Sequence, residues 1–204
     1  MTAAGQSRDA GRPGATVSGG TAAAVQREPE LAGQTVVVIG GSAGIGLETA
    51  RRARVEGAEV ILTGRDPVRL SQAAQEVGAQ RTEAFDANDT ASLQRFFRDL
   101  PAPIDHVMIT AGGPVYGLLL GMDPAQVRNA LSDHIVLGIE VARNAAGKMR
   151  PGGTLVIMGG TSGRRVEHGL GIASAATAAL PPFAAGLALE LAPVRVKPYR
   201  RRLR

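Results

Sequence analysis

Short β-branched and apolar runs recur along this chain, and the first four begin 23–24 residues apart. The spacing holds one strand, one helix and two turns. Continuous apolar runs are typical of strands that are buried on both faces. The pattern predicts an α/β domain with a doubly wound parallel sheet of about six strands and helices on both faces. The expected strands are TVVVI (35–39), EVILT (59–63), TEAFD (82–86), HVMIT (106–110), TLVIM (154–158) and VRV (194–196).

Helix boundaries carry their own signals. Asp66-Pro67 and Asp123-Pro124 each place a capping acid before a proline at the first helical position, and Asp89 is a third candidate cap. Gly57 and Gly78 are expected to end the first two helices. Together these signals place helices between the predicted strands.

An uncharged stretch of 21 residues, 169–189, is long enough to cross a membrane. Pro181 and Pro182 interrupt it, and most of its residues are Ala and Gly. We therefore expect a buried helix of a soluble domain and no membrane partner.

Composition divides the 204 residues into three parts. Residues 1–30 hold almost no large apolar side chain and no secretory signal, which predicts a disordered N-terminal tail. Residues 31–196 form the predicted domain, and residues 197–204 a basic tail. The absence of cysteine excludes disulfides and indicates a reducing, cytoplasmic location. The three histidines are widely separated, so no metal site is expected.

The net charge of +5 comes from the C-terminal end. The last eight residues, KPYRRRLR, hold five cations and no acid, so the rest of the chain carries no net charge. A nucleic-acid-binding domain instead carries its cations on a folded face. We therefore expect no nucleic-acid partner.

A glycine-rich loop, GGSAGIG (40–46), follows the first predicted strand directly. Gly40, Gly44 and Gly46 allow a tight turn and close backbone approach, and the following helix points its N-terminus at the loop. This arrangement predicts that the loop binds the pyrophosphate of a dinucleotide. After the second strand Arg65 follows, where a site that prefers NAD usually has an acid. The planar cation suits a 2′-phosphate, so NADP(H) is favoured and NAD(H) stays possible.

Over residues 33–196 the chain resembles the short-chain dehydrogenase/reductase family. The resemblance rests on the order of VVIGGSAGIG, VILTGRDPVRL, FDAND, ITAGG, GGTLVIMGGTSG and LALELAPVRV. It implies a Rossmann-like fold and hydride transfer between a nicotinamide cofactor and a small-molecule carbonyl or alcohol. It also implies nucleotide contacts: pyrophosphate at Gly40, Ser42, Gly44, Ile45 and Gly46, 2′-phosphate at Arg65, adenine at Asp86 and Ala87, and the nucleotide after the fourth strand at Ala111 and Gly112. For Asp86 a turn-forming role is the alternative.

The resemblance fails at the catalytic helix. The family places a Tyr there and a Lys four residues later, but this chain has Ala173 and Thr177, or Ile172 and Ala176 in a register shifted by one. No Y-x-x-x-K occurs anywhere in the chain. The Asn that the family often carries in the preceding helix has no clear counterpart around SDHIV (132–136).

Two residues remain as catalytic candidates. Ser162, beside Thr161, is the hydroxyl nearest to the family's Ser and could orient a carbonyl, although a turn role is the alternative. His168 precedes the catalytic helix and could exchange a proton near neutral pH, although it could equally be a solvated loop residue. His134 is expected in mid-helix with a structural or interfacial role.

The family pattern also stops after the sixth strand, so a last strand and a substrate-covering segment are missing. One codon choice for the final nine residues reads V-N-L-I-A-A-G-F after deletion of one nucleotide, close to the family's continuation. We therefore expect 197–204 to be a frameshifted end or else a genuine basic tail. The alternatives to an active enzyme are a non-catalytic NADP(H)-binding sensor or partner subunit, and a truncated inactive product. A homodimer would form through the helix that follows Asp123-Pro124 and the helix over 172–191.

Overall fold

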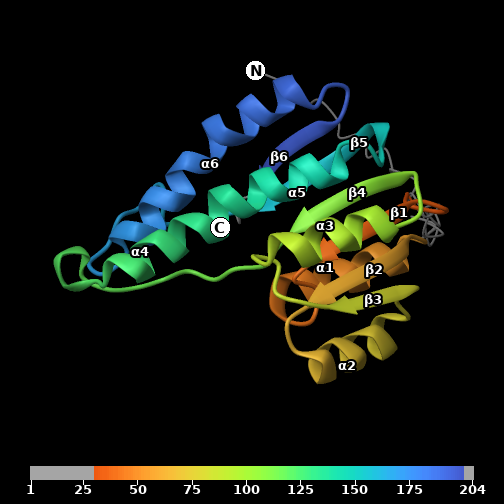
Figure 1. The fold of residues 1–204 in the computed structure, drawn as a ribbon, viewed down its shortest axis with the longest axis horizontal. Helices are drawn as coiled ribbons and strands as arrows, with labels where there is room; N and C mark the ends of the chain where they lie inside the picture. Colours follow the sequence, from red (N-terminus) through yellow and green to blue (C-terminus); the bar gives the residue numbers. More distant parts are fainter. Residues whose placement is uncertain (1–29, 200–204) are drawn as a thin grey trace, which may run out of the picture.

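A six-stranded parallel sheet forms the centre of the molecule (Figure 1). The computed structural model describes residues 30–199. The strand order is β3-β2-β1-β4-β5-β6, and each neighbouring pair is parallel. The order reverses between β1 and β4, which confirms the doubly wound architecture and puts the ligand-binding crevice at that point. The strands are β1 (Thr35–Ile39), β2 (Glu59–Gly64), β3 (Arg81–Ala84), β4 (Ile104–Ile109), β5 (Met149–Met158) and β6 (Arg195–Tyr199).

The helices connect these strands with the predicted caps. Asp66, Asp89 and Asp123 each accept a hydrogen bond from a backbone N–H in the first turn of the helix that follows. Gly78 ends α2 in the left-handed conformation, which favours glycine. The helices are α1 (Gly44–Val55), α2 (Pro67–Val77), α3 (Thr90–Asp99), α4 (Pro124–Leu131), α5 (Leu137–Ala145) and α6 (Gly171–Glu190), with a 3₁₀ turn η1 (Leu119–Gly121) and a π-helical turn η2 (Ser132–Val136).

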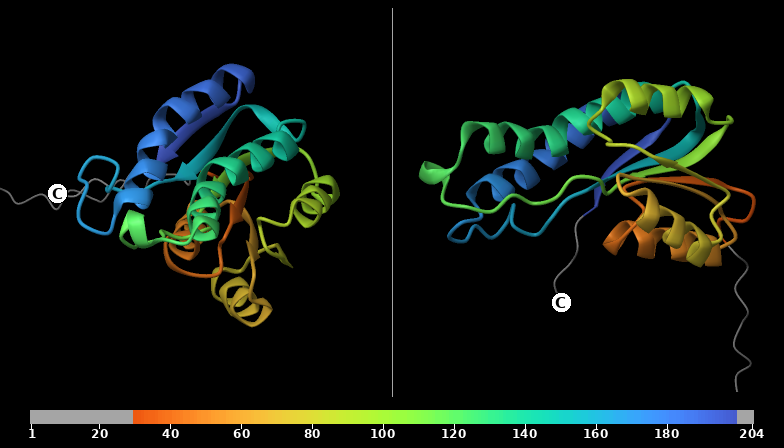
Figure 2. Two further views of the ribbon diagram at one scale, coloured as in Figure 1. Left: turned by 60° about the vertical axis from the view of Figure 1, so that its left-hand side comes forward. Right: turned by 60° about the horizontal axis from the view of Figure 1, so that its bottom comes forward.

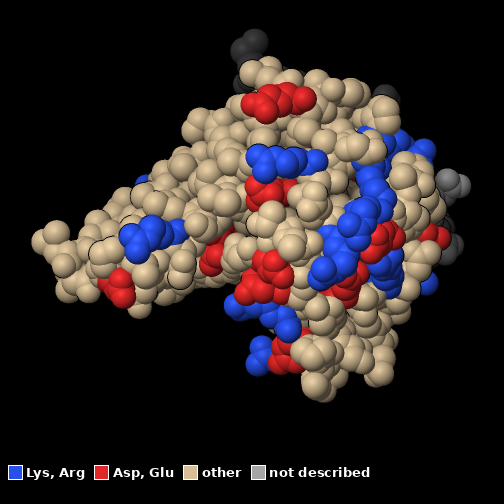
Figure 3. Space-filling view, viewed as in Figure 1, with Lys and Arg blue, Asp and Glu red and all other residues tan. Residues whose placement is uncertain are grey.

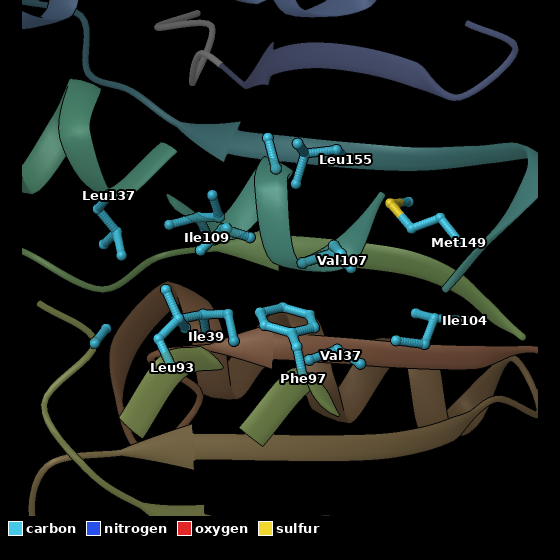
Figure 4. Close-up of a cluster of buried hydrophobic side chains, with 14 of the residues drawn as sticks. Val37, Ile39, Leu93, Phe97, Ile104, Val107, Ile109, Leu137, Met149 and Leu155 are labelled. Carbon is cyan, nitrogen blue, oxygen red and sulfur yellow. The ribbon is translucent and has the colours of Figure 1, made fainter. Parts of the chain in front are cut away.

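Side chains alternate between the two faces of the sheet and build two separate cores. Val36, Val38, Val60 and Leu62 pack with α1 and α2. On the opposite face the sheet packs with α3, α5 and α6. Figure 4 shows part of that second core, where Leu93 and Phe97 of α3 lie against side chains of β1 and β4. Burial on both faces explains why the strands are continuous apolar runs.

Five of the six strands differ from their predicted bounds. β2 ends one residue later than predicted, and β4 runs over Ile104–Ile109 rather than over 106–110. β3 ends at Ala84, two residues early, and β5 begins at Met149 rather than at 154. The early part of β5 pairs Met149 with Ile104 before a register shift in the ladder. β6 runs to Tyr199 because Lys197, Pro198 and Tyr199 continue the parallel register with β5. β6 therefore extends three residues past the predicted domain boundary at 196.

The predicted terminal segments lie mostly outside the described residues. Residues 1–29 and 200–204 are not described, so the expected disordered tail over 1–30 and most of the basic end are untested. Both stay predictions.

The uncharged stretch forms α6, which continues through Pro181 and Pro182 as one helix. By length and composition α6 is the one helix of residues 30–199 that could cross a membrane. In the structure it packs on β6, α4 and η2, and its side chains from Ile172 to Ala184 include seven buried ones. The core helix of a soluble protein passes the same test of length and composition.

α4, η2 and α5 follow one another without a break and lie beside α6 in both views of Figure 2. The π-helical turn lies in the middle of this long helix. Such turns widen a helix by one residue and occur frequently at functional sites.

Charged side chains of both signs are intermingled on the face shown in Figure 3. Among residues 30–199 several cations are paired with acids, at 3.1 Å for Arg81–Glu83, 3.1 Å for Arg98–Asp99 and 2.7 Å for Arg150–Asp105. This face therefore carries no field of a single sign. The absence of a nucleic-acid partner stays a prediction.

Candidate functional site

A cavity of about 750 Å³ opens at the carboxyl ends of the strands, where β1 and β4 diverge. Its size lies within the range of small-molecule and cofactor sites. All ten residues that the sequence predicted to contact a nucleotide line it. Ser162, one of the two catalytic candidates, lines it as well, and His168 does not.

The phosphate loop is tied to the two strands beside β1. The backbone N–H groups of Gly40 and Gly41 donate to the Thr63 carbonyl of β2 at 3.2 and 2.8 Å. From the other side, the Thr110 hydroxyl lies 3.1 and 3.0 Å from the carbonyls of Ile39 and Gly40, to which it can donate. These contacts hold the loop in place between β2 and β4.

Two glycines of the loop sit where no side chain fits. Gly40 has a φ of +93°, and a Cβ there would lie 2.6 Å from the Ala111 backbone nitrogen. A Cβ at Gly46 would lie 2.3 Å from the Gly40 carbonyl oxygen. The loop is therefore shaped by close backbone packing, which leaves its outer surface open to a ligand.

The N-terminus of α1 points into this loop without a side-chain cap. Its N-cap residue, Ala43, offers no acceptor, whereas α2, α3 and α4 are each capped by an aspartate. The first turn of α1 also holds no acidic residue. Unpaired N–H groups and the helix dipole make such an end a site for a phosphate group.

Two arginines stand at the end of β2. Arg65 and Arg69 both line the cavity and both are exposed. Within residues 30–199 Arg65 has no ion-pair partner, whereas Arg69 lies 3.7 Å from the Asp66 carboxylate. The sequence argument missed Arg69, which lies in the first turn of α2.

The loop after β3 forms the opposite wall. The Asp86 carboxylate accepts the Asn88 backbone N–H at 3.0 Å, so it has the turn-forming role considered for it. Its other oxygen has no hydrogen bond within the described residues, and Asp86 lines the cavity. Ala87 is buried beside it. Turn formation and nucleotide contact are therefore compatible at Asp86.

The same loop is connected to the π-helical turn η2. The Asn88 side-chain amide donates to the Asp133 carboxylate at 2.7 Å. Asp133 also packs on the loop after β4, because a Cβ at Gly112 would lie 2.9 Å from its Cβ. These contacts hold η2 at the cavity, where Asp133 and His134 both line the wall.

The wall contributed by α6 contains no acid or base. Ala173 and Thr177 line the cavity, and the residues of the alternative register, Ile172 and Ala176, do not. The structure therefore supports the first register for the counterparts of the family's Tyr and Lys. Neither an alanine nor a threonine can exchange a proton as a Tyr–Lys pair does.

Ser162 and Thr177 present two hydroxyl groups beside Gly160. A Cβ at Gly160 would lie 3.7 Å from the Ser162 hydroxyl and 3.6 Å from the Thr177 hydroxyl. Ser162 also has a turn role, since its carbonyl accepts the Arg165 backbone N–H at 3.2 Å. The two hydroxyls can donate to or accept from a polar group of a bound ligand.

The three histidines lie in different places. His168 is exposed in the loop before α6 and does not line the cavity. His106 lies near the start of β4, where its Nε2 is 2.7 Å from the Gln34 side-chain oxygen. His134 lines the cavity, whereas His168, which the sequence argument named as a candidate acid–base residue, does not. The sequence carries no local motif for His134, which lies within η2.

Among residues 30–199 no three His, Asp or Glu side chains come together as metal ligands.

Comparisons with known proteins agree with this geometry. The family model described as short chain dehydrogenase matches residues 34–198. A short-chain dehydrogenase/reductase of the fungus Stachybotrys chlorohalonatus, ATR9, is 26% identical over 183 residues, which cover 82% of this chain and 72% of that protein. The cyclic-di-GMP-binding biofilm dispersal mediator protein of Escherichia coli is 31% identical over 166 residues, covering 79% and 68%. The crystal structure of BdcA in complex with NADPH superposes with a TM-score of 0.76 at 28% identity, covering 82% of this chain and 70% of that one.

Strand order, phosphate loop and family model thus agree over nearly the whole described part of the chain. This chain belongs to the short-chain dehydrogenase/reductase family of oxidoreductases, whose members bind NAD(P)(H).

Proposed function

We propose that this protein binds NADP(H) in the cavity and transfers a hydride between the nicotinamide and the carbonyl or alcohol carbon of a small molecule. The observation that carries the proposal is the continuity of one cavity from the phosphate loop at Gly40 to the hydroxyls of Ser162 and Thr177. Such a cavity holds a dinucleotide at one end and leaves room for a substrate at the other.

The preference for NADP(H) over NAD(H) rests on Arg65 and Arg69. Both guanidinium groups line the cavity at the end of β2, and no acid occupies the position that usually binds a ribose 2′-hydroxyl. Guanidinium groups bind phosphate in a bidentate manner. The structurally similar protein BdcA was crystallised with NADPH, which supports the same preference here.

The remaining cofactor contacts are distributed along the cavity. The N-terminus of α1 would hold the pyrophosphate with the backbone of Gly44, Ile45 and Gly46. The free oxygen of Asp86 would accept the adenine amino group. NADP(H), when bound, would supply the hydride, and the chain would supply the binding site. Ser162 would orient the substrate carbonyl by donating a hydrogen bond.

A non-catalytic NADP(H)-binding sensor or partner subunit is the second candidate function. It is favoured by Ala173 and Thr177, which replace the usual proton donor and its neighbour. Under either function we propose a cytoplasmic protein with no membrane and no nucleic-acid partner. We also propose a homodimer through α4–α5 and α6, whose exposed small residues would allow close helix packing.

One experiment distinguishes the hydride-transferring enzyme from the non-catalytic sensor or partner subunit. The protein is titrated with NADPH by fluorescence, and NADPH oxidation is then followed with a panel of aldehydes and ketones. Binding with oxidation supports the enzyme. Binding without oxidation by any carbonyl supports the sensor, and the absence of NADPH binding contradicts both and leaves the truncated inactive product.

A further inference from the structure

We infer that His134 is the catalytic acid–base group of this cavity. It exchanges the proton that no residue of α6 can exchange. The inference rests on the proposed hydride transfer and names the residue that exchanges the accompanying proton.

His134 lies where a proton donor is needed. It belongs to η2, and η2 packs against α6, the helix that carries Ala173 and Thr177. All three side chains line the same cavity. The imidazole therefore belongs to the same cavity as the two residues that fail to supply an acid or base.

The hydrogen bonding of His134 leaves one ring nitrogen available. Its Nδ1 lies 3.1 Å from the carbonyl oxygen of Ala130. Because a carbonyl only accepts, Nδ1 must carry a hydrogen and donate it. Nε2 is then an acceptor in the neutral ring and a donor in the protonated ring, and no hydrogen bond to it exists within the described residues. A histidine with one nitrogen fixed by a carbonyl and the other free is oriented for proton exchange.

The turn that carries the imidazole is fixed from two sides. Asp133 accepts a hydrogen bond from Asn88 at 2.7 Å and packs on Gly112. Both neighbours belong to loops that line the cavity. A catalytic side chain has to be held within a fraction of an ångström of its productive position, and these contacts provide that support.

The other titratable side chains of the cavity are less suited. Arg65, Arg69 and Asp86 lie at the ends of β2 and β3, among the residues proposed to bind adenosine. Asp133 is engaged with Asn88. Tyr116 also lines the cavity, but this residue is 63% exposed and so lies open to solvent.

The step balances without a further reactant. In reduction, the substrate carbonyl carbon accepts a hydride with its electron pair from reduced nicotinamide, and the carbon–oxygen π bond breaks toward oxygen. That oxygen takes the proton of His134 Nε2, whose N–H pair stays on the ring. The neutral imidazole keeps its Nδ1 hydrogen on the Ala130 carbonyl and takes a new proton from water. Oxidation of an alcohol runs the same steps in reverse.

The elements that pack with η2 carry few charged side chains. Asp133 is its neighbour in η2, α4 brings Arg128, and α5 brings Glu140 and Arg143. The facing helix α6 carries no charged side chain before Glu190.

The first test compares three variants of the full chain: His134→Asn, Tyr116→Phe and His168→Ala. General acid–base groups contribute about 10²–10⁴-fold to rate, so His134→Asn is expected to lower NADPH oxidation by about 100-fold or more. Its NADPH affinity should stay unchanged, and the fall of the wild-type reduction rate with rising pH should disappear. Full turnover in His134→Asn, with loss of turnover in either of the other variants, would overturn the inference.

The second test needs no turnover. Diethyl pyrocarbonate acylates accessible neutral imidazoles, and mass spectrometry locates the modified histidine. NADPH is expected to protect His134 and to leave His168 reactive. Equal labelling of His134 with and without saturating NADPH would overturn the inference while the proposed hydride transfer stands. Wild-type protein that binds NADPH but oxidises it with no carbonyl would overturn both.

Discussion

Replacing Gly46 with alanine is expected to destabilise the protein and to abolish nucleotide binding. A Cβ at this position would lie 2.3 Å from the Gly40 carbonyl oxygen and 2.5 Å from the Thr110 hydroxyl. Real Cβ atoms essentially never approach other atoms so closely, so the loop or Thr110 has to move. Movement of Thr110 disrupts its hydrogen bonds to the Ile39 and Gly40 carbonyls.

The size of the effect follows from these contacts. Loss of the hydrogen bonding of the Thr110 hydroxyl lowers stability by about 1 kcal/mol net. Forcing an extra carbon into a packed region costs about 1–3 kcal/mol. We therefore expect Gly46→Ala to lower the free energy of unfolding by about 2–4 kcal/mol. For a domain of this size that corresponds to a fall in Tm of about 5–15 °C.

Gly186→Ala is the matched control, because Gly186 is also in a helix but is exposed and has no atom within 4 Å of its ideal Cβ. That change should stabilise the protein by about 0.5–1 kcal/mol. Both variants are compared by thermal unfolding and by NADPH titration. A Gly46→Ala protein with the wild-type Tm and wild-type NADPH affinity would refute the packing of the loop described above.

Three further predictions concern stability. Asp66→Ala removes the cap of α2, which accepts two backbone N–H groups, and should cost about 1 kcal/mol in denaturant unfolding. Phe97→Ala empties a fully buried site in the core against Phe96 and should cost about 3–5 kcal/mol by the same assay. Burial lowers the pKa of His106 below its ordinary value, so the unfolded chain binds the proton more strongly and stability should fall as pH drops below about 6.5. His106→Gln should make this fall shallower.

A specific result would contradict each of these three stability predictions. Asp66→Asn retains an acceptor, so equal losses for Asn and Ala would exclude capping as the cause. A loss below about 1 kcal/mol for Phe97→Ala would mean that the core can collapse around the gap. An unfolding free energy with the same pH dependence in wild type and His106→Gln would exclude His106 as its source.

The helices and strands were predictable because local sequence signals and tertiary packing favour the same elements. The strand from Thr35 to Ile39 is apolar at nearly every position, and its bounds are as predicted. Asp66 and Asp123 cap the helices that they were predicted to cap. The early start of β5 at Met149 was not predictable, because it depends on pairing with a residue of β4 that is distant in sequence.

The residues that line the phosphate-loop end of the cavity were predictable, and His134 at its other end was not. A local motif identifies Gly40 and Gly46, because close backbone approach needs glycine at fixed spacing. His134 has no such motif: it reaches the cavity through a π-helical turn whose extra residue per turn changes which side chains face inward. His168 lies just before α6 in sequence, yet the loop that carries it leaves it exposed to solvent.

The most direct test of the account is the affinity of the protein for NADPH and NADH, in wild type and in Arg65→Ala. Hydrogen bonds to a charged group contribute about 1.5–3 kcal/mol, so we expect wild type to bind NADPH about 10–100-fold more tightly than NADH. Arg65→Ala should lose most of this difference while NADH affinity stays the same. Arg164→Ala, an exposed arginine outside the cavity, should retain it. Equal affinity for the two nucleotides in wild type, or binding of neither, would contradict the assignment of this cavity to NADP(H).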